Sequence, residues 1–177
     1  PREAQQKLAF FQAEARWNEY QHHFLGFTLA FPRAWFVYSG DDYIGFYVPR
    51  LSEKADYAQP HQVRLRVKGL AEENITYPEA VQYYLSSVQE DPARVGKVDA
   101  RELRNSGKQY ALLRYKLRHD DGEKYDYLMA LTVYDGDVML FSASAQGKAA
   151  DWLEPHFLRL IFSLKYIPKL PGQTAAE

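Results

Sequence analysis

The chain contains no cysteine among its 177 residues. This absence excludes structural disulfides, thiolate nucleophiles, iron–sulfur clusters and zinc sites built from cysteine. The sequence also lacks the roughly eighteen consecutive apolar residues that a membrane-spanning helix needs, so we expect no membrane span. Neither sign of charge dominates, since 22 basic residues stand against 23 acidic ones and the formal net charge is −1. A general nucleic-acid binder needs a basic surface for phosphate, so nucleic acid is not an expected partner.

Aromatic residues, by contrast, are abundant and make up 15% of the chain. Together with the balanced charge, they are not the composition of a disordered protein. A chain of this length suits one compact domain, which buries roughly 70% of the surface of its unfolded form. The first residue is Pro1 rather than Met, so we expect the natural N-terminus to lie upstream. Whether a signal peptide or a lipid anchor precedes Pro1 is a question that the sequence leaves open.

We expect three parts along the chain: a helical extension at residues 1–23, a single domain at 24–167 and a flexible tail at 168–177. The extension contains neither glycine nor proline from residue 2 to residue 20 and has many good helix formers. Its apolar residues at helical spacing are Leu8, Phe11 and Ala15, and Trp17 could extend the same stripe. The tail is rich in turn formers and small residues, which are typical of a frayed end.

Within the domain, apolar and polar residues alternate in short runs separated by turn residues, as in β-strands. This alternation predicts strands at 27–31, 35–38, 43–48, 63–67, 98–103, 110–118, 124–134 and 138–145. Asp135-Gly136 is a strong signal for a tight hairpin turn between the last two. The strand at 63–67 has one polar face, since Arg64, Arg66 and Lys68 alternate with its apolar residues, and this favours an antiparallel sheet.

Two helices interrupt the strands. Thr76 and Glu79 have the spacing of a capping box, and Pro78 fits the first turn. The helix that they begin has an apolar face of Val81, Tyr84, Leu85 and Val88. A second helix is expected after Asp151, with Pro155 limiting how far upstream it begins. Its apolar face is Leu153, Phe157, Leu160, Ile161 and Leu164. Strands in runs with helices between them predict an α+β domain with an antiparallel sheet.

The order of these motifs resembles the PsbP-like superfamily. The opening Gly-Phe-Thr-Leu-Ala-Phe-Pro-Arg-Ala-Trp at 26–35 is similar to the family's aromatic–x–aromatic–Pro–x–x–Trp start. The hairpins at 105–115 and 133–140 are similar to its Asn-Gly and Val-x-x-Gly hairpins. The strand at 141–145, Trp152 and the segment at 161–165 resemble its ending, although Leu164 replaces the usual Phe of Ser-Phe-Lys.

This resemblance spans about Phe24 to Lys165, with the N-terminal extension outside it. The group includes the extrinsic photosystem II protein, Ran-binding Mog-type proteins, periplasmic DcrB lipoproteins and Eag-type chaperones of type VI secretion. The resemblance implies an antiparallel sheet flanked by helices in an α/β/α sandwich. It also implies a binding or assembly role, because most members are not enzymes.

The densest cluster of potential metal ligands is His119, Asp120, Asp121 and Glu123. Carboxylates and an imidazole in this pattern could hold a divalent cation. Asp and Gly are, however, also what a tight hairpin turn requires, and we favour that interpretation here and for Asp41 and Asp42. The sequence shows no Gly-x-Ser-x-Gly motif, P-loop or dinucleotide-binding glycines. We therefore expect neither catalysis nor a cofactor.

Two groups of residues are candidates for contact with a partner. Arg64, Arg66 and Lys68 share one face of a strand, which is either a solvated face or a cationic surface for an acidic protein or phosphate. Cations on other strands could extend it: Arg101, Arg104, Arg114, Lys116 and Arg118. The tyrosines of the first hairpin either pack on the sheet or bind a partner. The predicted partner-binding residues are Tyr38, Asp41, Asp42, Tyr43, Tyr47, Arg64 and Arg66.

Three functions follow as hypotheses. The first is a non-enzymatic accessory or assembly protein that binds a protein partner, with a periplasmic or other extracytoplasmic location favoured over the cytoplasm. The second is a cytosolic adaptor chaperone of the Eag type, which binds apolar helices of secretion effectors through its sheet face. The third is a metal- or small-ligand-binding protein that uses the acidic turn at 119–123.

Overall fold

The computed structural model describes residues 16–22, 26–40, 43–48, 61–68, 75–134, 136–145 and 148–166. The elements in chain order are β1 (Trp17–His22), β2 (Phe27–Pro32), β3 (Phe36–Ser39), β4 (Tyr43–Val48), β5 (His61–Lys68), α2 (Tyr77–Glu90), β6 (Asp99–Asn105), β7 (Lys108–Arg118), β8 (Lys124–Tyr134), β9 (Asp137–Ala145), α3 (Lys148–Phe162) and β10 (Lys165–Tyr166). Among these residues, no helix is both long and apolar enough to span a membrane.

The strands form one large and one small antiparallel sheet. The large sheet has seven strands in the order β3-β4-β5-β9-β8-β7-β6, and the small sheet has the order β1-β2-β10. After β5 the chain passes through α2 to the far edge at β6, and a meander through β7 and β8 then returns to β9, which pairs with β5. The predicted α+β fold with an antiparallel sheet flanked by helices is confirmed.

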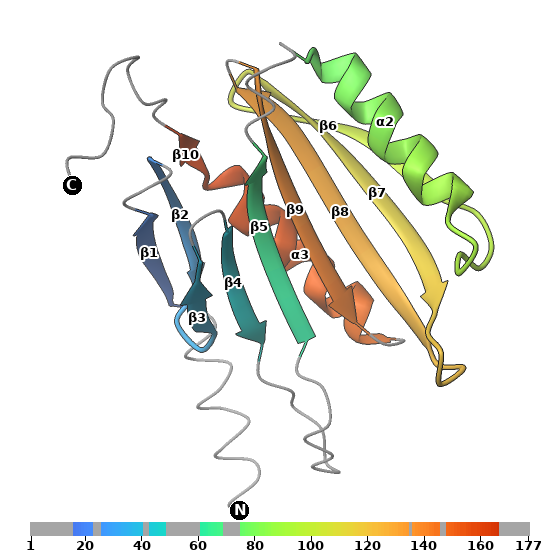
Figure 1. Ribbon diagram of the computed structural model, residues 1–177. Helices are drawn as coiled ribbons and strands as arrows, with labels where there is room; N and C mark the ends of the chain where they lie inside the picture. The colour runs from blue at the N-terminus through green and yellow to red at the C-terminus, as the bar shows by residue number, and fades with distance from the viewer. Residues whose placement is uncertain are drawn as a thin grey trace, which may run out of the picture.

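Each face of the large sheet packs against a helix (Figure 1). On one side α3 and the small sheet bury the larger core, which includes Phe46 of β4 and Phe157 of α3. On the other side Tyr84 and Val88 of α2 pack on Leu113 of β7. Below, the two sides are called the α3 side and the α2 side.

Local signals explain how α2 begins and which residues it buries. The backbone N–H and the hydroxyl of Thr76 both donate to the Glu79 carboxylate, at 2.8 and 2.6 Å. These hydrogen bonds hold the pKa of Glu79 below its ordinary value. Tyr84 is buried while Tyr83 is 64% exposed, so only one of the adjacent tyrosines faces the sheet.

The predicted helical extension at residues 1–23 is wrong at its C-terminal end. Residues 17–22 form β1, which pairs with β2 over six residues from Trp17 opposite Pro32 to His22 opposite Phe27. Backbone pairing with a strand further along the chain overrides local helix propensity here. The earlier part of the extension, with Leu8, Phe11 and Ala15, lies outside the described residues, as does the predicted tail at 168–177.

The predicted start of the second helix near Asp151 is also wrong. Helix α3 begins at Lys148 and continues through Pro155. Pro155 lies on the exposed side of the helix, where water can satisfy the carbonyl that loses its backbone donor. The predicted apolar face is confirmed, since its five residues are all buried: Leu153, Phe157, Leu160, Ile161 and Leu164.

Ser163 joins the end of α3 to the small sheet. Its hydroxyl accepts a hydrogen bond from the backbone N–H of Ala30 at 2.7 Å and donates to the carbonyl of Leu160 at 2.6 Å. One side chain therefore caps the helix and contacts β2 at the same time. This is the serine of the closing Ser-Leu-Lys segment.

We expect Ser163→Ala to lower the free energy of unfolding by about 1–2 kcal/mol, because it leaves the Ala30 N–H without its partner. Urea denaturation measures this change. The matched control is Ser87→Ala on the exposed side of α2, which we expect to change stability by less than about 0.5 kcal/mol. Equal effects of the two substitutions would contradict this role of Ser163.

Candidate functional site: an open half-face of the large sheet

The two sides of the large sheet are covered unequally. On the α3 side, α3 and the small sheet together bury residues from β4 to β9. On the α2 side, α2 packs mainly on β7 and β8, and no other described helix or strand lies over β3, β4, β5 and β9 (Figure 1). We call this uncovered area the open half-face. Its residues are Phe36, Tyr38, Tyr43, Gly45, Tyr47, Ser142 and Ser144, with Gln62, Arg64, Arg66 and Lys68 of β5 placed there by strand register.

Strand alternation determines which residues belong to this face. Ile44 and Phe46 of β4 are fully buried on the α3 side. Because successive residues of a strand point to opposite faces, Tyr43, Gly45 and Tyr47 lie on the α2 side.

The three predicted tyrosines form one cluster on the open half-face. The ring of Tyr38 lies 4.6 Å from that of Tyr47 and 6.1 Å from that of Tyr43, between centroids. Gly45 is opposite Tyr38 in the β3–β4 pairing, and a Cβ atom on Gly45 would overlap the Tyr38 ring. The glycine therefore leaves the space in which this ring lies against the strand.

Phe36 belongs to the same face and was missed by the sequence reasoning. It is paired with Tyr47 across the strands and is 68% exposed. Its neighbour Trp35 is only 3% exposed. Strict alternation in the run Trp35 to Tyr38 is the signal that could have identified it.

Strand register places the predicted arginines beside the tyrosines. Arg64 lies between Gly45 and Ser142, and Arg66 lies between Tyr43 and Leu140. The only carboxylate within β3, β4, β5 and β9 is Asp137, which accepts a hydrogen bond from Tyr166 of β10 at 2.5 Å. The predicted residues Asp41 and Asp42 lie outside the described residues.

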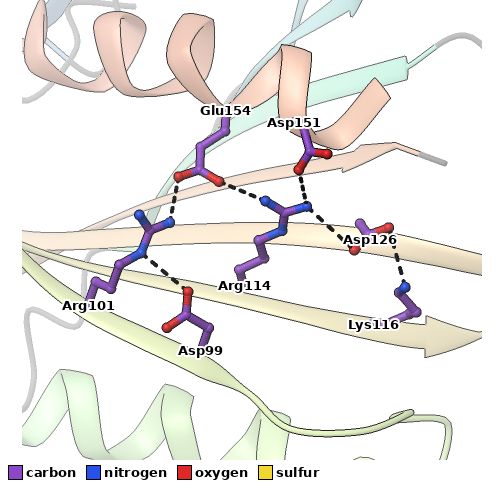
Figure 2. Close-up of polar contacts among 7 residues, drawn as sticks. All are labelled: Asp99, Arg101, Arg114, Lys116, Asp126, Asp151 and Glu154. Carbon is purple, nitrogen blue, oxygen red and sulfur yellow. Dashed lines mark hydrogen bonds and ion pairs between the residues drawn. The ribbon is translucent and has the colours of Figure 1, made fainter. Parts of the chain in front are cut away.

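The predicted extension of the cationic surface across other strands is wrong. Arg101, Arg114 and Lys116 lie on the α3 side, where they form ion pairs with carboxylates (Figure 2). Arg104 is on the α2 side but at the far edge of the sheet, 3.6 Å from Glu102. Register between strands that are distant in sequence divides these cations between two faces.

Glu154 of α3 joins two arginines of this ion-pair network. Its oxygens lie 2.5 Å from Arg101 and 3.1 Å from Arg114. Arg114 also contacts Asp151 at 2.7 Å and Asp126 at 3.9 Å. The hydrogen bond to Asp151, with the nearby carboxylates, raises the pKa of Arg114 above its ordinary value. These contacts hold the first half of α3 against β6, β7 and β8.

The acidic hairpin at 119–123 has the contacts of a turn. The His119 ring is hydrogen-bonded to the Tyr127 hydroxyl at 2.7 Å, Asp121 accepts from the Glu123 N–H at 2.9 Å, and Gly122 has a φ of 82°. The weak metal candidates His119, Asp120, Asp121 and Glu123 do not converge, and the described residues contain no group of three or more ligands that could hold a metal.

The shifted pKa values within the described part of the chain are those of structural groups. Burial raises the pKa of Tyr110 and of Tyr115 to about 12. The pKa of Glu79 is lowered and that of Arg114 is raised, so both groups are held in their charged forms. No resolved shift brings a group toward neutral pH, which is where an acid–base catalyst works best. Every buried polar side-chain atom in this part also has a hydrogen-bond partner.

Comparison of the sequence with protein-family models and with curated proteins finds no match. The fold, however, is similar to solved structures. Cyanobacterial PsbP (CyanoP) from Synechocystis sp. PCC 6803 superposes with a TM-score of 0.60 and 16% identity, covering 86% of this chain and 94% of that one. LpqN of Mycobacterium tuberculosis, a protein involved in cell envelope biogenesis, superposes with a TM-score of 0.62 and 16% identity, covering 86% of this chain and 91% of that one.

A third similar structure is PA94 from Pseudomonas aeruginosa, a protein of unknown function. It has a TM-score of 0.61 and 14% identity, covering 87% of this chain and 99% of that one. At such low identity the likeness shows the fold alone. The chain therefore has a PsbP-like fold, and the resemblance found in the sequence is confirmed at this level.

We expect Gly45→Ala to lower the free energy of unfolding by about 1–3 kcal/mol, because the added methyl group displaces the Tyr38 ring. In a Tyr38→Ala background the same change should be neutral or stabilising by up to about 1 kcal/mol, since alanine is favoured over glycine within a strand. Urea denaturation of the four proteins tests this. An equal loss in both backgrounds would show that the Tyr38 ring is not the obstacle.

We expect Glu154→Gln to lower the free energy of unfolding by about 1 kcal/mol, because it removes the shared charge between two arginines. The loss should shrink in 1 M NaCl, where ion pairs are screened. Glu102→Gln on the edge strand is the control, and thermal or urea unfolding is the measurement. A loss independent of salt would contradict an electrostatic role for Glu154.

Proposed function

We propose that the protein is a non-enzymatic accessory protein that binds a protein partner through the open half-face, in an extracytoplasmic compartment. The observation that carries the proposal is the gathering of Phe36, Tyr38, Tyr43 and Tyr47 on the half of the sheet that no described helix covers. Phe36 and Tyr47 are exposed while Tyr38 and Tyr43 are partly buried, and exposed aromatic residues on one face are typical of interaction sites.

The chemistry of these side chains supports binding. Tyrosine offers a large apolar area and a hydroxyl at low entropic cost, because it has only two side-chain torsions to fix. The Tyr38 and Tyr47 rings are in contact at an interplanar angle of 30° and restrain each other before a partner arrives, and this preorganisation lowers the cost of association. Phe36 adds exposed apolar surface, and its transfer from water into an interface is favourable.

The similar structures support the location. LpqN is involved in cell envelope biogenesis, and the resemblance to periplasmic DcrB lipoproteins supports an extracytoplasmic location. The absence of catalytic motifs in the sequence and of pKa shifts toward neutrality in the described residues supports a role other than catalysis.

A cytosolic adaptor chaperone of the Eag type is the second candidate. The observation that favours it is the apolar part of the same region, since Phe36 is highly exposed and Met129 and Leu140 are only partly buried. The two candidates differ in compartment. Cell fractionation of the native host separates them, and a purely cytoplasmic protein would overturn the extracytoplasmic proposal.

The binding proposal is tested by placing benzoylphenylalanine at position 36 or 47 in the native host and irradiating the cells. We expect both positions to crosslink to the same discrete protein, which mass spectrometry identifies. Position 104, on the opposite edge of the sheet, is the control and should not give this product. The same product from position 104, or none from positions 36 and 47, would contradict the proposed face.

A further inference from the structure

The open half-face, on its described strands, carries basic residues and no acidic ones. Strand register places Arg64, Arg66 and Lys68 on it, and no Asp or Glu shares this face of β3, β4, β5 and β9. Elsewhere in the sheet, Arg101 and Arg114 each have a carboxylate within 3.1 Å. The chain as a whole has a charge of −1, so the excess is local. Charge complementarity favours a partner that brings carboxylates.

Hydroxyl groups add hydrogen-bond donors for such carboxylates. Ser142 and Ser144 of β9 are partly exposed and flank the β5 positions of Gln62 and Arg64. Tyr47 is 37% exposed beside Phe36. Hydroxyl–carboxylate hydrogen bonds are stronger than those between neutral groups.

The geometry of the sheet favours a helix over an extended segment. Strands β4, β5 and β9 have neighbours on both sides, so their backbone groups are used within the sheet. An extended segment laid on this face would find no backbone partners, and buried backbone groups must be paired. A helix satisfies its own backbone.

The position of α2 leaves room for that helix. Packed helices lie about 8–10 Å apart, which is about two strand spacings of about 4.8 Å. Because α2 packs mainly over β7 and β8, a neighbouring helix would lie over β9 and β5, the strand with Arg64 and Arg66 (Figure 1). At the border, the partly buried Met129 and Leu140 pack against the cluster under α2.

We infer that the partner presents an acidic amphipathic helix, which packs beside α2 over β9 and β5. Its apolar residues contact Leu140 of β9 on one side of β5 and the tyrosines of β4 on the other, and its carboxylates face the positions of Arg64 and Arg66 between them. This inference rests on the proposed function and specifies the chemistry of the segment bound there.

A display library of random 18-residue peptides, selected on the full chain and counter-selected on Phe36→Ala, tests the inference. We expect enriched peptides with net negative charge and apolar residues at helical spacing. A synthetic peptide from this pool should bind about tenfold more weakly to Arg64→Gln/Arg66→Gln, and also in 0.5 M compared with 0.05 M NaCl. Arg64→Lys/Arg66→Lys should restore binding, which excludes a folding defect.

Tyr83→Ala, which removes an equally exposed aromatic ring from α2, is the matched control and should bind the peptide like the natural chain. Enrichment of uncharged apolar peptides, or of none that depends on Phe36, would overturn the acidic-helix inference. The crosslinks from positions 36 and 47 report separately on the proposed function and can succeed where this selection fails.

Discussion

The pairing of β5 with β9 is the contact on which the rest of the structure depends. It joins the N-terminal hairpin strands to the C-terminal meander, from Gln62 opposite Ser144 to Lys68 opposite Val138. Both cores then form on one continuous sheet. A shift of one residue in this register would move every side chain of β5 to the other face. The open half-face therefore depends on one set of backbone hydrogen bonds between segments distant in sequence.

Much of the fold could be predicted because its signals are local. The alternation over 124–134 matches β8 at both ends, and β8 pairs with β9 in the predicted hairpin, with Tyr134 opposite Asp137. The start of α2 depends on Thr76 and Glu79, which are three residues apart. Turns, caps and strand alternation all act over a few residues, so they can be recognised without tertiary structure.

The errors concern features that depend on tertiary structure, with the exception of Phe36, which strict strand alternation could have identified. β1 is a strand because β2 pairs with it, and α3 begins before Pro155 because that residue is on the exposed side. The sequence placed Tyr38, Tyr43 and Tyr47 together correctly, since they belong to one hairpin. Which face of the sheet each cation lies on could not be predicted from the sequence, because it depends on the order and register of the six strands from β4 to β6.

The small sheet determines where the described region begins and ends. Its outer strands, β1 and β10, are the first and last described elements, and both flank β2. The small sheet packs on the α3 side. The described region therefore both begins and ends in the layer opposite the aromatic cluster, so neither of its ends lies on the face that we propose for partner binding.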